Sequence, residues 1–148
     1  MFSLDLFVPN TTLSGIYKQN LMMEPYPMPQ IHITYTPNLP SQPQLEPFVI
    51  QIHNAVAPLI SSDTSNFKTY LMPIERSVIG LADKEKAVMH IDFRMFTGRS
   101  AAIKQEVAKT ILLLARNTFS SPNGVETEIT LEVGNLDNDN YHKVIINQ

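Results

Sequence analysis

The sequence contains no cysteine, which excludes disulfides, thiolate zinc sites, iron–sulfur clusters and cysteine nucleophiles. It also lacks any apolar run near the roughly 20 residues that a membrane-spanning helix needs, so we expect no membrane partner. Positive charge is scarce: 11 Lys and Arg against 14 Asp and Glu give a net charge of -3. Because phosphate binding needs a basic surface, we expect no nucleic-acid partner. A cysteine-free chain fits the cytoplasm, where we place the protein.

Several common catalytic motifs are missing as well. The sequence has no G-x-S-x-G elbow, no glycine-rich phosphate loop and no H-E-x-x-H pair. Its four histidines show no metal-ligand spacing, so we interpret each as a surface or strand residue and expect no metal: His32, His53, His90 and His142. The first ten residues lack a positively charged start, which argues against a secretion signal.

Composition divides the chain into two parts. Seven of the 11 prolines lie between Pro25 and Pro47, and residues 1–47 carry only four charged side chains. The first 27 residues show no sustained period of either helix or strand. We therefore interpret residues 1–27 as an appendage and residues 28–148 as the folded domain.

Residue periodicity predicts two β-α-β units in this domain. In the first unit, alternation from Ile31 to Tyr35 predicts a strand, helical spacing predicts a helix over about 45–60, and a further strand covers 70–81 with a break at Pro73. In the second unit we expect a strand over 87–96, a helix after Ser100 as its N-cap, and a strand over 125–133.

These elements define an α/β (α+β) fold, because each helical crossover implies a parallel strand pair. The expected architecture is a four-stranded mixed sheet with both helices on one face. The other face must meet water, another subunit or both. We expect its apolar residues to favour association.

The pair Met28-Pro29 stands directly before the first predicted strand. If translation began at Met28, removal of that methionine would leave Pro29 with a free secondary amine. A free α-amino group titrates near ~7.7–8.0 and can take up and return a proton near neutral pH. The codons of Met23-Glu24 necessarily contain a GGA purine tract shortly upstream, as a bacterial ribosome-binding site would. The simpler interpretation is an internal proline at the start of a strand.

Arg99, in the segment TGRS, lies beside the start of a predicted helix, where backbone N–H groups also favour anions. A carboxylate site is one interpretation of this position. An ordinary surface arginine after a glycine turn is the other.

From Met28 onward the chain resembles the 5-carboxymethyl-2-hydroxymuconate isomerase family of the tautomerase superfamily. The matching pieces are MPQIHITYTPNL, VMHIDFRMFTGRS and the ITLEV strand with its Asn-rich tail. The resemblance implies a repeated β-α-β fold, a homotrimer with sites near subunit contacts, and neither a metal nor an organic cofactor. It implies that Pro29 shuttles the proton, that Arg99 holds a substrate carboxylate, and that Arg76 lies near a second such position, where the local pattern is offset.

Two functions from different classes follow from this resemblance. The first is a cofactor-independent isomerase that shifts a proton and a double bond in an unsaturated 2-hydroxy or 2-oxo carboxylic acid, such as 5-carboxymethyl-2-hydroxymuconate, in the catabolism of aromatic acids. The second is a non-catalytic trimeric binding or structural module in which Pro29 stays internal. A retained appendage would block amine chemistry, because an amide nitrogen has no basic lone pair.

Overall fold

The structure is a computed structural model that describes residues 28–120 and 124–147. The expected appendage, residues 1–27, lies outside the described residues. Residues 28–136 belong to one compact unit, and the segment from residue 137 onward falls outside that unit. The two parts are therefore described separately.

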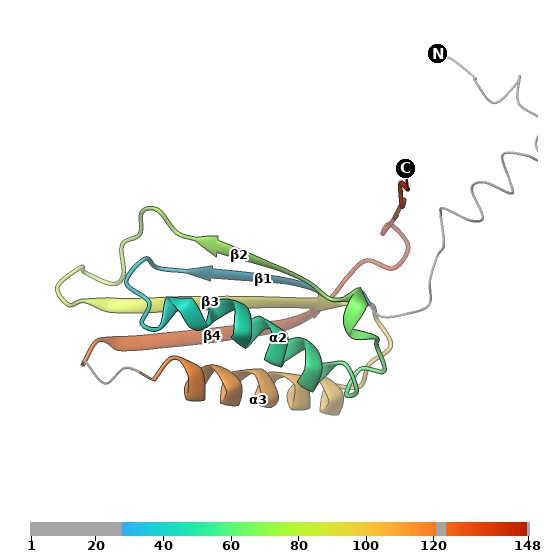
Figure 1. The fold of residues 1–148 in the computed structure, drawn as a ribbon, viewed down its shortest axis with the longest axis horizontal. Helices are drawn as coiled ribbons and strands as arrows, with labels where there is room; N and C mark the ends of the chain where they lie inside the picture. The colour runs from blue at the N-terminus through green and yellow to red at the C-terminus, as the bar shows by residue number, and fades with distance from the viewer. Residues whose placement is uncertain (1–27, 121–123, 148) are drawn as a thin grey trace, which may run out of the picture. The chain divides into compact units, whose positions relative to one another are not determined.

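The compact unit contains four strands and two helices, with short 3₁₀ turns at Gln42–Gln44 and Thr64–Asn66. The elements in chain order are β1 (Gln30–Tyr35), α2 (Leu45–Val56), β2 (Lys68–Pro73), β3 (Lys86–Met95), α3 (Ala101–Thr118) and β4 (Glu126–Asn135) (Figure 1). The strands form one sheet in the order β2-β1-β3-β4. The pairs β1–β2 and β3–β4 are parallel and β1–β3 is antiparallel, which confirms the expected mixed sheet.

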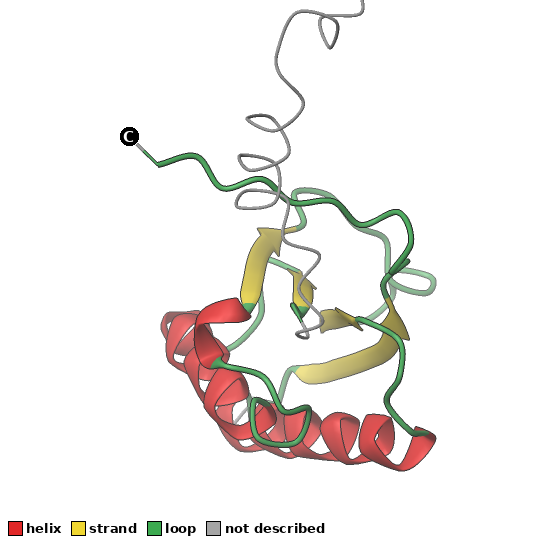
Figure 2. Cartoon of the chain, turned by 90° about the vertical axis from the view of Figure 1, so that its right-hand side faces the viewer, coloured by secondary structure: helices red, strands yellow, loops and turns green. Residues whose placement is uncertain are grey.

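Both helices cover the same face of the sheet (Figure 2). Alternation along β1 and β3 turns one set of side chains toward the helices, and these are fully buried or nearly so: Ile31, Ile33, Tyr35, Ala87, Met89, Ile91, Phe93 and Met95. Phe48 of α2 meets Phe119, just after α3, edge to face with ring centroids 5.0 Å apart. This contact ties the two helices together above the sheet.

The largest differences between predicted and observed element ends are at the ends of α2 and β2. Helix α2 ends at Val56 rather than near residue 60. Ala57 still has helical backbone angles, but Pro58 has no backbone N–H with which to continue the helical hydrogen bonds. The predicted strand over 70–81 was wrong beyond Pro73, where β2 ends and an exposed loop begins. Val78 and Leu81 of that loop are 79% and 89% exposed. Their apolar side chains led to the strand prediction, although neither side chain is buried.

The face of the sheet without helices is mainly polar. Across it runs one row of register partners, one from each strand: Tyr70, His32, Asp92 and Glu132. His32 stacks on Tyr70 at 5.1 Å. The next outward residue of β3 is Arg94, whose Nε donates to the Asp92 carboxylate at 2.8 Å and whose Nη2 lies 3.6 Å from Glu132. The expectation that apolar residues of this face favour association stays a prediction.

Residues 137–147 contain neither helix nor strand. The Asp137 carboxylate accepts hydrogen bonds from the Asn140 side chain at 2.7 Å and from the Asp139 backbone N–H at 3.1 Å. These two bonds hold the pKa of Asp137 below its usual value. The short apolar run near the end, from Val144 to Ile146, is exposed.

Candidate functional site

Pro29 is buried and stands immediately before β1. Its carbonyl oxygen accepts a hydrogen bond from the backbone N–H of Lys68 at 3.1 Å, which continues the parallel β1–β2 ladder by one step. Met28 precedes it and is 4% exposed. In this chain the Pro29 nitrogen is therefore part of a peptide bond and carries no basic lone pair.

Arg99 lies in the turn that joins β3 to α3. Gly98 has a φ of +111°, a backbone conformation that glycine adopts without steric cost. Ser100 caps the helix as predicted, since its Oγ accepts the backbone N–H of Ile103 at 3.2 Å. The Arg99 Nη2 donates to the carbonyl oxygen of Ile60 at 2.8 Å, which holds the half-buried guanidinium against the turn after α2.

The strand register brings Pro29 and Arg99 to the same end of the sheet. Because β1 and β3 are antiparallel, the first residue of β1, Gln30, pairs with Arg94 near the end of β3. Pro29 comes directly before β1, and Arg99 follows β3 by four residues. An N-terminal amine at Pro29 and the Arg99 guanidinium would thus lie at one end of the sheet. A free amine can transfer protons, and a guanidinium can hold a carboxylate.

Arg76 lies elsewhere. It is exposed in the loop after β2, and β2 runs parallel to β1 and ends beside Tyr35. The backbone N–H of Ile74 donates to the Tyr35 carbonyl at 2.8 Å, which fixes the loop at that end. The length of β1 therefore separates Arg76 from Pro29 within one chain, roughly 17 Å for a six-residue strand.

Lys68 is a cation at the Pro29 end that sequence reasoning did not single out. It is the first residue of β2, it is exposed, and it pairs with Gln30 in the sheet. Its position depends on where β2 begins, and the predicted start at residue 70 left Lys68 outside the strand. The β1–β2 register is the signal that identifies it.

His53 of α2 lies near this end as well. Its Nε2 is 2.8 Å from the hydroxyl oxygen of Thr69, and its ring centroid is 5.0 Å from that of Phe67. Burial of the imidazole lowers the pKa of His53 below its ordinary value of 6.5. His53 is therefore neutral at physiological pH, and its contacts connect α2 to the start of β2.

Among residues 28–120 and 124–147, no group of three or more His, Asp or Glu side chains is arranged to hold a metal ion. In the same part of the chain, neither helix combines the length and the hydropathy of a membrane span.

Residues 29–147 match the model of one protein family, described as 5-carboxymethyl-2-hydroxymuconate isomerase. A search of curated protein sequences found no significant match.

Solved structures share the fold at low sequence identity. A 5-carboxymethyl-2-hydroxymuconate isomerase from Deinococcus radiodurans R1 is 18% identical, with a TM-score of 0.68 over 77% of this chain and 87% of that one. A 5-carboxymethyl-2-hydroxymuconate delta-isomerase is 17% identical, with a TM-score of 0.64 over 74% and 83%. A fused 4-OT described as a symmetric trimer is 16% identical, with a TM-score of 0.59 over 72% and 86%.

Proposed function

The chain belongs to the 5-carboxymethyl-2-hydroxymuconate isomerase family, and from this premise we propose that it is a cofactor-independent isomerase. Its substrate is an unsaturated 2-hydroxy or 2-oxo carboxylic acid, of which 5-carboxymethyl-2-hydroxymuconate is the example we favour. The reaction moves one proton and one double bond along the conjugated system and leaves the oxidation level unchanged. We assign it to the catabolism of aromatic acids in the cytoplasm.

Pro29 carries the proton in this proposal. In a chain that begins at Pro29, the secondary amine accepts a proton from the substrate and leaves a conjugated anion, with negative charge spread over oxygen and carbon. The resulting ammonium returns the proton to a different carbon, which completes the shift and restores the amine. The burial of Pro29 supports this role, because a site that excludes water strengthens the interactions that stabilise the anion.

Arg99 holds a substrate carboxylate at the same end of the sheet. Its Nη2 is engaged by the Ile60 carbonyl at 2.8 Å. A guanidinium has five N–H donors in a planar fork, so the others remain for a bidentate contact with a carboxylate. Lys68, at the start of β2, supplies a second positive charge near Pro29.

Arg76 reaches such a site only from a second copy of the chain, because β1 separates it from Pro29 within one subunit. We therefore propose a homotrimer in which Arg76 of one subunit approaches Pro29 of another. The fused 4-OT, a symmetric trimer with the same fold, supports this assembly.

The observation that carries the proposal is the family match beginning at residue 29, which is the residue that needs a free amine. One observation favours the alternative, a non-catalytic trimeric binding or structural module. Met28 is buried and bonded to Pro29, so a retained N-terminal segment would leave no amine at the site.

The experiment compares chains expressed from Met28 and from Met1. After N-terminal sequencing, each is assayed by ultraviolet absorbance for ketonisation of 5-carboxymethyl-2-hydroxymuconate. We expect activity only where Pro29 is the first residue, and a rate loss of about 100-fold or more in Pro29→Ala. Pro37→Ala, in an exposed loop beyond the other end of β1, is the matched control and keeps the rate. An unchanged rate in Pro29→Ala rules out the shuttle.

A further inference from the structure

A pocket of about 360 Å³ lies between the last turns of α3 and the first half of β4. It is lined by Leu112, Arg116, Phe119, Ser120, Val125, Thr127 and Ile129. Its position follows from the register: β4 begins opposite Lys86, the first residue of β3, whereas Pro29 lies at the end of β3. The pocket is therefore at the opposite end of the sheet from Pro29 and Arg99.

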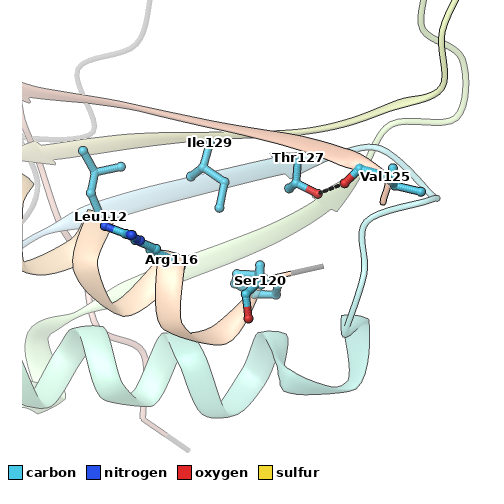
Figure 3. A pocket seen from close by; sticks show the side chains of 7 residues that line it. Leu112, Arg116, Ser120, Val125, Thr127 and Ile129 are labelled. Atoms are coloured by element: carbon cyan, nitrogen blue, oxygen red, sulfur yellow. Dashed lines mark hydrogen bonds between the residues drawn. The ribbon is translucent and has the colours of Figure 1, made fainter. Parts of the chain in front are cut away.

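One wall of this pocket is formed by the end of α3 and the other by the start of β4. Leu112 and Arg116 are four residues apart, so they share one side of the last turns of α3, and Ser120 follows two residues after the helix ends. Thr127 and Ile129 alternate along β4 and turn toward the helices, and Val125 continues this alternation just before the strand. Figure 3 shows the labelled side chains of the helix and of the strand facing each other across the pocket. Since β4 is an edge strand, the pocket opens at the side of the sheet.

The pocket combines one positive charge with apolar walls. Leu112, Phe119, Val125 and Ile129 supply the apolar surface, and Leu112 remains 39% exposed despite being in this cleft. In the described part of the chain, Arg116 forms no ion pair with a carboxylate. The Thr127 hydroxyl donates its one hydrogen to the Val125 carbonyl at 3.3 Å and so cannot also donate to a bound anion.

We propose that this pocket binds an amphipathic monocarboxylate, an aliphatic or aryl-aliphatic acid. The guanidinium of Arg116 pairs with the carboxylate, and the apolar chain of the ligand lies between Leu112 and Ile129. The volume falls within the range of small-molecule sites, about 300–1,000 Å³. Because the site lies at the opposite end of the sheet from Pro29, it is separate from the proposed isomerase site, and its occupation does not depend on a free amine.

Octanoate is the probe that tests the proposal, titrated by calorimetry into the full chain. We expect saturable binding whose affinity falls about tenfold or more in Arg116→Gln, since losing a hydrogen bond to a charged group lowers affinity by about that factor. Octanamide, which has the same chain without the charge, binds about tenfold or more weaker than octanoate to the unaltered protein. Lys104→Gln, on the same helix but outside the lining, keeps the affinity, and so does Arg99→Gln.

A crystal of the full chain with 8-bromooctanoate locates the ligand, because the anomalous signal of bromine marks its chain. The expected peak lies between α3 and β4. The proposal is overturned by the absence of saturable binding, by equal affinity in Arg116→Gln, by equal affinity for octanamide, or by a bromine peak elsewhere. Loss of binding in Arg99→Gln also overturns it, because the acid would then occupy the proposed isomerase site. A circular-dichroism melt of each variant establishes that it is folded.

Discussion

Replacing Arg99 by Gln tests the proposed carboxylate site at a side chain whose surroundings are defined. The guanidinium is held by one hydrogen bond, from Nη2 to the Ile60 carbonyl at 2.8 Å. A hydrogen bond to a charged group contributes about 1.5–3 kcal/mol, and each 1.4 kcal/mol is about tenfold in affinity. We therefore expect kcat/KM for 5-carboxymethyl-2-hydroxymuconate to fall about 10- to 150-fold in the chain that begins at Pro29.

The same change has a small structural cost. Arg99 is half-buried, so losing its bond to Ile60 destabilises the fold by about 1 kcal/mol, which lowers Tm by about 2–4 °C. Arg99→Lys keeps the charge but cannot hold the Ile60 carbonyl and a bidentate carboxylate together, so its kcat/KM lies between those of the unaltered chain and Arg99→Gln. Arg116→Gln, at the other end of the sheet, is the control that keeps kcat/KM. Unchanged kcat/KM in Arg99→Gln refutes the reasoning.

Two further predictions concern stability. Because burial lowers the pKa of His53, the unfolded chain takes up its proton first as the pH falls below about 6.5, so the free energy of unfolding decreases there. Urea unfolding between about pH 5 and pH 8 should show a flatter profile for His53→Gln; identical profiles contradict the assignment. Ser100→Ala removes the α3 cap and should cost about 1 kcal/mol in the same assay, whereas Ser100→Asp should retain stability. Equal loss in both variants argues against capping.

Much of the fold was predictable from the sequence because its signals are local. Alternation along 87–96 identified β3, and Ser100 marked the start of α3. Predicting the parallel pairing within each β-α-β unit required only the rule that helical crossovers are right-handed and join parallel strands. The limits of β2 were not predictable in this way, since Val78 and Leu81 are apolar but lie in an exposed loop.

The candidate site depended on non-local information that the sequence does not carry. Residue chemistry and a family resemblance both pointed to Pro29 and Arg99, and the antiparallel β1–β3 pairing places them at one end of the sheet. Arg76 and Lys68 are eight residues apart, yet the parallel β1–β2 register places them at opposite ends. Strand pairing decides which cations lie near Pro29, and pairing is a property of the whole sheet.

The N-terminal residue of the protein made in its own cell tests the central claim most directly. If Pro29 is the catalyst, sequencing of the native protein should begin Pro-Gln-Ile, and its intact mass should correspond to residues 29–148. A native sequence beginning Met-Phe-Ser would leave the nitrogen of residue 29 in a peptide bond and would contradict the proposed proton shuttle.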